Sequence, residues 1–226
     1  MKRVYGSLFL FTIFIISMSM STQKKTKIIF FGDSITQMGA DPGGYIVRMS
    51  DDLKAKGLES QYDLVGAGVG GNKVYDLYLR MDDDVLAQNP DVVVIWVGVN
   101  DVWHKTSGTG TDADKFEKFY VAIVKKLQTK NIKVVVVTPA VIGERTDYTN
   151  QQDGDLNYYS NIIRRIAKEY KTDIVDLRKD FREYDLKNNP ENKESGILTK
   201  DRVHLTDDGN KFVAEKMLNV LIPGYK

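Results

Sequence analysis

The segment KIIFFGDS at residues 27–34 places an apolar run directly before Gly32-Asp33-Ser34. A continuous apolar run that ends in turn-forming residues is typical of a strand buried on both faces. Comparable runs recur at residues 62–65, 92–97, 133–137 and 173–177. Because parallel sheets bury both faces, these five runs predict strands of one parallel sheet.

The stretches between these runs carry apolar residues at helical spacing. The clearest series lies on one helical face and comprises Phe116, Phe119, Tyr120, Ile123, Val124 and Leu127. A last helix is expected from about Asp207 to Leu221, with Phe212, Val213, Met217, Leu218 and Leu221 facing inward. Strands that alternate with helices along the whole chain predict a three-layer α/β fold with parallel strands.

The chain of 226 residues is long enough for one domain with a substantial core, and it shows no second domain pattern. Lys and Arg number 32 against 31 Asp and Glu, a formal charge of +1. Such a balance gives no general field that attracts nucleic acid or anionic membranes. Nucleic acid is therefore not an expected partner.

The N-terminus has the pattern of a secretory signal peptide. A basic start at residues 1–3 precedes a short apolar stretch at residues 8–16, and small residues follow at Ser19 and Ser21. We expect cleavage near one of these serines. The alternative is an uncleaved anchor, but the apolar stretch is well short of the roughly 20 residues that cross a bilayer.

The expected organisation is thus a signal peptide at residues 1–21 and one mature domain at residues 22–226, with no stable membrane span after signal removal. Cysteine is absent, so no disulfide and no lipid-modified cysteine can form. A secreted or periplasmic location is therefore preferred to a lipoprotein.

Polar residues follow each of the first three apolar runs. Ser34 follows the first run, the glycine-rich segment Gly66–Gly71 the second, and Asn100 the third. Ligands of parallel sheets bind at the carboxyl ends of the strands, so these three loops are expected to converge.

Ser34 is the candidate nucleophile, and a serine hydroxyl needs a nearby base. The chain has two histidines, His104 and His204. Asp201 stands three residues before His204, close enough for one loop turn to bring its carboxylate to the imidazole. Alternatively, Ser34 is a helix N-cap, and Asp201 and His204 belong to a capped loop with a surface histidine.

Acyl transfer also needs donors for the developing oxyanion. The sequence offers the backbone N–H of Ser34, a backbone N–H within Gly66–Gly71, and the side-chain amide of Asn100. From the residues alone, Gly68, Gly70 and Gly71 are all candidates for the second donor, and an ordinary turn or cap is the alternative for each segment.

Together the four segments resemble the SGNH hydrolase superfamily, also called the GDSL esterase/lipase family, over nearly the whole mature chain. The matching blocks are Gly32-Asp33-Ser34, the segment ending in Gly71, Gly98-Val99-Asn100-Asp101, and Asp201-Arg202-Val203-His204. Their order and separation agree with the family. One departure is Gly66, where family members often have asparagine.

The resemblance implies a flavodoxin-like α/β/α sandwich with a five-stranded parallel sheet, and a reaction without metal or cofactor. It implies that Ser34 is the nucleophile, His204 its base and Asp201 the partner of the base. It also implies an oxyanion hole formed by Ser34, Gly71 and Asn100, with Gly71 chosen from the register. The nucleophile segment lacks the Gly-x-Ser-x-Gly elbow of α/β-hydrolases, which disfavours that lipase core.

The function expected from these residues is a serine esterase that cleaves short-chain acyl or O-acetyl groups from carbohydrates or small molecules. Its substrate partner is a small-molecule or glycan ester. Lysophospholipids and thioesters are alternative substrates, and the oligomeric state is not assigned.

Three other classes compete with an esterase. Gly66-x-Gly68-x-x-Gly71 matches a dinucleotide fingerprint, although it follows the second strand rather than the first. The tyrosines and tryptophans suit a non-catalytic carbohydrate-binding module, which has no need of a triad. Asp82–Asp84 with His104 suggests metal-dependent hydrolysis, but two histidines without cysteine make a poor zinc set.

Several residues near the expected site have no assigned role. Trp103 and His104 follow Asn100 and either line the pocket or simply pack. Gln37, Met38 and Asn72 are further candidates for the pocket wall.

Overall fold

The computed structural model describes residues 24–225, so the expected signal peptide at residues 1–21 lies outside the described part. Its strands are β1 (Thr26–Gly32), β2 (Tyr62–Gly68), β3 (Val92–Trp96), β4 (Lys133–Val137) and β5 (Asp173–Val175). They form one sheet in the order β2-β1-β3-β4-β5, and every neighbouring pair is parallel. The five predicted strands and their parallel arrangement are confirmed.

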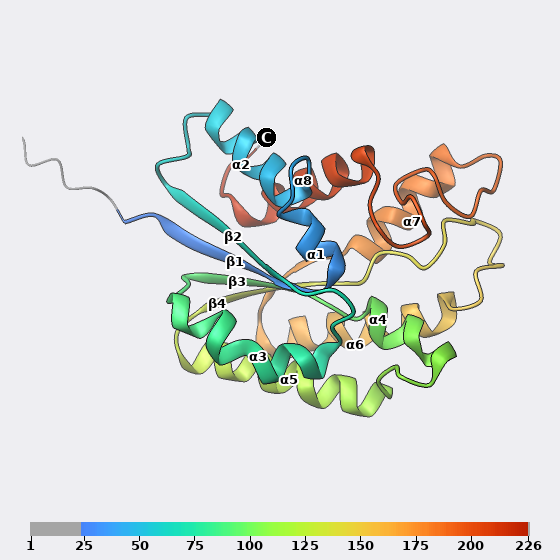
Figure 1. The fold of residues 1–226 in the computed structure, drawn as a ribbon, viewed down its shortest axis with the longest axis horizontal. Helices are drawn as coiled ribbons and strands as arrows, with labels where there is room; N and C mark the ends of the chain where they lie inside the picture. Colours follow the sequence, from blue (N-terminus) through green and yellow to red (C-terminus); the bar gives the residue numbers. More distant parts are fainter. Residues whose placement is uncertain (1–23, 226) are drawn as a thin grey trace, which may run out of the picture.

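The α-helices of the described chain are α1 (Ser34–Gly39), α2 (Tyr45–Ala55), α3 (Val74–Asp84), α4 (Val99–Trp103), α5 (Ala113–Thr129), α6 (Asp153–Tyr170), α7 (Leu177–Asn188) and α8 (Asp207–Leu221). Two 3₁₀ helices cover Leu86–Gln88 and His104–Ser107. Helices α1, α2, α7 and α8 cover one face of the sheet, and α3, α4, α5 and α6 cover the other (Figure 1). The predicted three-layer α/β/α sandwich is confirmed.

The apolar runs form the centre of the core. Every residue of β3 is buried, as are the last five residues of β1. The predicted helical face on α5 is also buried, except at Phe119, which is half-buried and meets the rings of Tyr75 and Tyr78. These strands are apolar on both faces because helices pack on both sides of the sheet.

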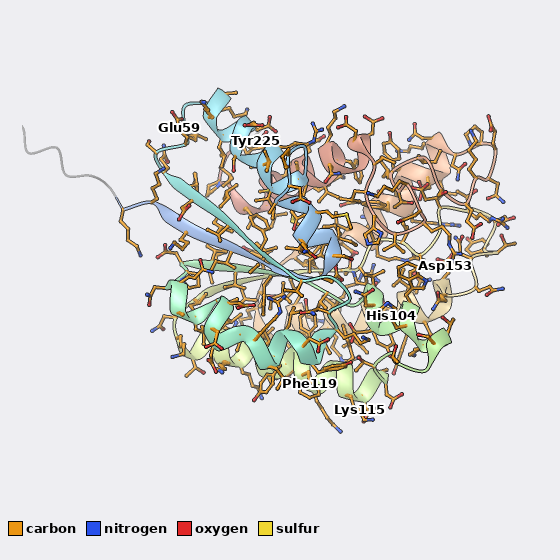
Figure 2. The ribbon with its side chains drawn as sticks, viewed as in Figure 1. Glu59, His104, Lys115, Phe119, Asp153 and Tyr225 are labelled. Atoms are coloured by element: carbon orange, nitrogen blue, oxygen red, sulfur yellow. The ribbon has the colours of Figure 1, made fainter. Side chains whose placement is uncertain are left out.

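Helix α8 begins and ends at the residues expected from the sequence. The hydroxyl of Thr206 caps its first turn by accepting a hydrogen bond from the Gly209 backbone N–H at 3.0 Å. Phe212 is half-buried and packs its ring against Phe181 and Tyr184 of α7. Beyond α8, Tyr225 lies beside α2, where its hydroxyl donates to the Asp52 carboxylate (Figure 2).

The order of the strands determines where the loops meet. From β1 the chain first pairs β2 on one side and then crosses to β3 on the other side, so the order reverses at β1. Ligands of open parallel sheets bind at such a reversal. Gly32 at the end of β1 lies opposite Gly68 of β2 and Trp96 of β3, so the loops after these three strands start at the same level.

Among the helices of residues 24–225, none combines the length and the apolar character needed to cross a lipid bilayer.

Candidate active site

Ser34 is the first residue of α1, directly after the end of β1. The helix cap is Asp33, whose carboxylate accepts a hydrogen bond from the Ile35 backbone N–H at 3.0 Å. Ser34 is therefore not the cap, and its own N–H belongs to the first turn, where helices leave donors unpaired. Gly32 makes this turn possible, because a Cβ there would lie 2.4 Å from the Trp96 carbonyl oxygen.

His204 reaches Ser34 from the other end of the sequence. Its Nε2 lies 2.9 Å from Ser34 Oγ, and its Nδ1 lies 2.7 Å from Asp201 Oδ2. The structure thus brings together the three side chains that the sequence proposed as a triad. Because Nδ1 donates to the carboxylate, Nε2 remains an acceptor for the serine hydroxyl.

The loop that carries Asp201 and His204 is folded around the Asp201 carboxylate. Asp201 Oδ1 accepts the backbone N–H groups of Val203 at 3.2 Å and His204 at 2.8 Å. Arg202 between them has φ +81°, an uncommon angle for a residue with a side chain, and its carbonyl accepts the Gly143 N–H at 2.9 Å. Partial burial opposes ionisation of Asp201, but the hydrogen bonds from His204 and Val203 hold its pKa below the usual value.

A second carboxylate, which the sequence analysis missed, anchors the segment just before this loop. Glu144 is fully buried and accepts the backbone N–H groups of Ile197 at 2.9 Å, Leu198 at 2.7 Å and Thr199 at 2.6 Å. The pKa of the neighbouring Asp185 is raised to about 7, mainly by burial and secondly by electrostatic repulsion from Glu144. Glu144 therefore fixes the start of the catalytic loop from 53 to 55 residues away.

The glycine-rich loop presents one free backbone donor beside Ser34. Gly68 lies in β2 opposite Gly32 of β1, and the Gly70 N–H donates to Gln37 Oε1 at 2.8 Å. Within residues 24–225, the Gly71 N–H has no hydrogen-bond acceptor. Gly71 also has φ +76°, in the left-handed region that favours glycine. The geometry thus favours Gly71 over Gly70 as an available donor.

Asn100 lies on α4 and is almost completely buried. Its Nδ2 donates to the backbone carbonyl of Asn72 at 3.1 Å, which fixes the orientation of the amide. The amide carries a second N–H, so one hydrogen remains for a ligand. Asn72 was a candidate for the pocket wall, and the structure gives it this orienting contact as well.

Arg80 joins these loops, and the sequence analysis missed it too. Its Nη2 donates to the carbonyls of Gly32 at 2.7 Å and Ala67 at 3.0 Å, and its Nε donates to Asn72 Oδ1 at 2.7 Å. Its guanidinium also stacks on Phe31, 4.5 Å from the ring centroid. The only sequence signal is a lone arginine beside the apolar positions of α3.

Two buried carboxyl groups lie beneath the site. Burial raises the pKa of Asp33 to about 7 and that of Asp101 to about 6, and the charge of Asp101 contributes to the shift of Asp33. Asp101 accepts the Val74 backbone N–H at the start of α3. Both carboxyl groups hydrogen-bond to backbone N–H groups at the starts of helices, whereas the Ser34 hydroxyl contacts His204.

Trp103 stands beside the imidazole of His204. The two rings meet edge to face with their centroids 6.5 Å apart. His104, the next residue, lies beyond the carboxyl ends of the strands (Figure 2). Its pKa is lowered, mainly by burial and secondly by the positive charge of Lys73. Trp103 therefore borders the site itself.

Two carboxylates of the acidic run Asp82–Asp84 form ion pairs with basic side chains. Asp82 pairs with Lys126 at 2.7 Å and Asp84 with Arg80 at 2.7 Å. Within residues 24–225, no group of three or more histidine, aspartate or glutamate side chains is arranged to hold a metal ion.

The model of the GDSL-like lipase/acylhydrolase family matches residues 30–212, which include all four segments of the site. The chain belongs to this family. It is a carboxylic ester hydrolase, as its relatives are.

Relatives in the family include an acetylxylan esterase of Geobacillus stearothermophilus, 30% identical over 213 residues that cover 85% of this chain and 92% of the relative. The mouse (Mus musculus) isoamyl acetate-hydrolyzing esterase 1 homolog is 23% identical over 83% of this chain and 78% of its own length. Among solved structures, an acetyl xylan esterase, AlAXEase, is 68% identical with a TM-score of 0.86, covering 87% of this chain and 100% of its own.

Proposed function

We propose that this protein removes acetyl groups from the hydroxyls of xylan-derived sugars, with Ser34, His204 and Asp201 as its catalytic triad. The observation that carries the proposal is the contact between Ser34 Oγ and His204 Nε2 at 2.9 Å, continued from Nδ1 to Asp201 at 2.7 Å. The arrangement supplies a nucleophile, a base and a group that orients the base.

In the first step, Ser34 Oγ attacks the acetyl carbonyl carbon while His204 Nε2 takes the hydroxyl proton. The carbonyl oxygen becomes an oxyanion, for which the backbone N–H groups of Ser34 and Gly71 and the amide of Asn100 are the donors. As the intermediate collapses, the protonated His204 gives its proton to the leaving sugar oxygen. An acetyl-serine ester remains.

In the second step, a water molecule attacks the acetyl-serine carbonyl and His204 takes one of its protons. Collapse of this intermediate releases acetate, and the proton returns to Ser34 Oγ. Asp201 stabilises the imidazolium in both steps, since hydrogen bonds hold its pKa below the usual value and keep the carboxylate ionised.

An acetyl group is favoured over longer acyl chains by the relatives. The relative from Geobacillus stearothermophilus and the solved structure of AlAXEase are named as acetylxylan esterases, and the mouse relative is named for an acetate ester with a different alcohol. Two further solved structures of the Geobacillus stearothermophilus enzyme are described as catalytic mutants, with a serine or a histidine replaced by alanine. These descriptions support the same chemistry for this chain.

The decisive experiment is Ser34→Ala, with Ser50→Ala as the matched control. Ser50 lies on α2, and its hydroxyl donates to the Ile46 carbonyl. We expect Ser34→Ala to lower kcat for p-nitrophenyl acetate and for acetylated xylooligosaccharides by about 10³-fold or more. Full acetate release by Ser34→Ala would remove this serine from the mechanism. Absence of acetate release from sugars by the wild-type enzyme would refute the proposed substrate.

We further infer that the enzyme is exported, with a signal peptide at residues 1–21 and a catalytic domain at residues 22–226 that acts outside the cytoplasm. The support is the basic start followed by the short apolar stretch at residues 8–16. N-terminal sequencing of the protein recovered from the medium or periplasm is expected to begin after Ser19 or Ser21. A product that starts at Met1 would contradict cleavage.

A further inference from the structure

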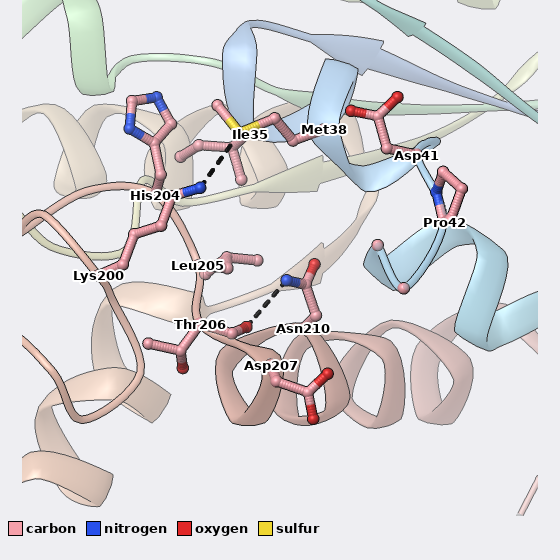
Figure 3. Close-up of a pocket in the computed structure, with 12 residues that line it drawn as sticks. Ile35, Met38, Asp41, Pro42, Lys200, His204, Leu205, Thr206, Asp207 and Asn210 are labelled. Carbon is pink, nitrogen blue, oxygen red and sulfur yellow. Dashed lines mark hydrogen bonds between the residues drawn. The ribbon is translucent and has the colours of Figure 1, made fainter.

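A cavity of about 290 Å³ lies beside the catalytic histidine, on the face of the sheet covered by α1, α2 and α8. One wall is the loop between α1 and α2 with Asp41, and the facing wall is the start of α8 with Asn210 (Figure 3). His204 and Lys200 border one end, and Met38 of α1 lies across from Lys200. Lys200 Nζ lies 3.9 Å from Met38 Sδ.

Because His204 lines this cavity, the cavity is a candidate site for the alcohol that leaves during ester cleavage. In ester cleavage the same imidazole that accepts the serine proton returns a proton to the leaving oxygen, so the alcohol must lie against it. Two of the three proposed oxyanion donors, in the Gly71 loop and on α4, lie outside the lining of the cavity. The third, the Ser34 N–H, belongs to the residue before Ile35, which lines the cavity. Trp103, also on α4, packs against the imidazole from that side. The cavity thus borders the residue that follows Ser34 and is separate from the Gly71 and Asn100 donors.

The lining of the cavity matches the chemistry of a sugar ring. Ile35, Met38 and Leu205 offer apolar surface for the C–H groups of a pyranose. The cavity also offers two acceptors for the hydroxyl groups of a sugar, the exposed Asp41 carboxylate and Asn210 Oδ1. The Asn210 amide is oriented because its Nδ2 donates to the Thr206 carbonyl at 2.9 Å. Within residues 24–225, no side chain or backbone group donates a hydrogen bond to the Asp41 carboxylate.

The two walls are held at a fixed spacing. Arg48 of α2 donates from Nε to the Gly43 carbonyl at 2.7 Å in one wall and from Nη2 to the Asp207 carboxylate in the other. Asp41 itself sits in a tight turn, since its carbonyl accepts the Gly44 N–H at 2.8 Å. A preformed site of this kind binds without the cost of ordering its walls.

We propose that this cavity binds the pyranose ring that carries the scissile acetyl group, with Asp41 and Asn210 accepting hydrogen bonds from its free hydroxyls. The inference rests on the proposed function and adds the residues that select a sugar over other alcohols. Asp41 and Asn210 act on substrate selection, whereas the Ser34 triad acts on every acetyl ester.

The test compares two esters with the same acyl group in wild type, Asp41→Ala and Asp41→Asn. The control is Asp83→Ala, an exposed aspartate on α3, across the sheet from the cavity. For acetylated xylobiose, we expect Asp41→Ala to lower kcat/KM by about tenfold or more, mainly through KM, because hydrogen bonds to a charged group are lost. For p-nitrophenyl acetate, whose leaving group offers no hydroxyl donors, we expect a change of about twofold or less.

Binding of the alcohol alone gives a second readout. Unacetylated xylobiose should inhibit p-nitrophenyl acetate hydrolysis competitively in wild type and in Asp83→Ala, and about tenfold more weakly in Asp41→Ala. Asp41→Asn keeps one acceptor oxygen, so its inhibition by xylobiose should be weaker than that of wild type and stronger than that of Asp41→Ala. Equal losses on both esters, or no loss on the sugar ester, would overturn the proposal.

The outcomes for the cavity and for the proposed function are separable. If Ser34→Ala abolishes cleavage of both esters while Asp41→Ala behaves like wild type on both, the triad stands and the sugar site is wrong. If Ser34→Ala leaves either ester cleaved at the wild-type rate, the proposed function itself fails, whatever Asp41→Ala does.

Discussion

Arg80 Nε donates to Asn72 Oδ1 at 2.7 Å, and this contact ties α3 to the loop that carries Gly71. The same guanidinium donates to the carbonyl of Gly32, two residues before Ser34. The backbone carbonyl of Asn72 in turn orients the amide of Asn100. One side chain therefore links all three segments that carry the proposed oxyanion donors, although it touches neither Ser34 Oγ nor His204.

Replacing Arg80 is expected to impair turnover more than substrate binding. We expect Arg80→Ala to lower kcat for p-nitrophenyl acetate by about tenfold to 100-fold with a small change in KM, because oxyanion donors act only when correctly placed. Free guanidinium ion should restore part of the lost kcat. Arg80→Lys should remain impaired, since an ammonium cannot reproduce the planar fork that reaches four acceptors.

Arg165→Ala provides the matched control, because Arg165 is an exposed arginine of α6 that pairs with Glu117 on the surface. A loss of kcat in Arg80→Ala that guanidinium does not relieve, together with a rise in KM of the same size, would indicate a general structural defect rather than positioning.

Asn100→Ala is expected to lower kcat for p-nitrophenyl acetate by about 10²-fold to 10³-fold while KM changes little, because the amide acts on charge that develops in the transition state. Steady-state kinetics on purified protein measure both quantities. Asn89→Ala, at an exposed turn beyond α3, serves as control. A pure increase in KM would argue that Asn100 binds the ground state instead.

Asp33 makes stability depend on pH. Its pKa is raised by burial to about 7, whereas an unfolded aspartate titrates near 3.8. Between these two values the folded state holds a proton that the unfolded state has lost, so the free energy of unfolding falls as pH rises. The contribution is fully present below about pH 4 and is lost by about pH 7.

Asp33→Asn should remove this dependence while keeping the cap, since Oδ1 of asparagine can still accept the Ile35 N–H. We expect the stability of the variant relative to wild type to improve by roughly 2 to 3 kcal/mol between pH 5 and pH 8. Urea denaturation at both pH values measures this difference. A constant difference at the two pH values would show that Asp33 is ionised in the folded protein throughout.

Features formed by residues close together in the sequence are predicted best, and contacts between residues far apart in the sequence are predicted least. Each of the five apolar runs overlaps one strand, although β2 continues to Gly68 and β5 ends at Val175. Helix α8 has the predicted bounds, because burial on both faces and helical spacing are local patterns. The contact between Asp201 and His204 lies within one four-residue turn, so spacing alone indicates it. The closeness of Ser34 and His204 is predicted because a serine nucleophile needs a base, and the family resemblance assigns that role to His204.

The supports of the site are less visible in the sequence because they act over long range. Arg80 reaches Gly32 from 48 residues away, and no local pattern marks a partner of that kind. The choice among the glycines likewise depends on Gln37, whose side chain occupies the Gly70 N–H and leaves that of Gly71 unpaired. Such choices require the folded positions of both segments.

Glu144 offers a test of whether a buried carboxylate far from the reaction holds the catalytic loop in place. It accepts three consecutive backbone N–H groups, from Ile197 to Thr199, and Thr199 lies two residues before Asp201. In Glu144→Gln one acceptor oxygen becomes an NH₂ group, which would face a backbone donor. We expect a loss of about 2 to 4 kcal/mol in the free energy of unfolding.

The loss of stability in Glu144→Gln should be concentrated in the loop at residues 197–204. Hydrogen exchange at the amides of residues 197–204 should accelerate in Glu144→Gln more than exchange in β3, because local opening is governed by the contacts of that segment. In Glu169→Gln, an exposed glutamate of α6, neither exchange nor stability should change. If Glu144→Gln lowered stability with uniform exchange across the sheet and loop, Glu144 would be a general core residue, and the position of His204 would depend on the short turn at Asp201 alone.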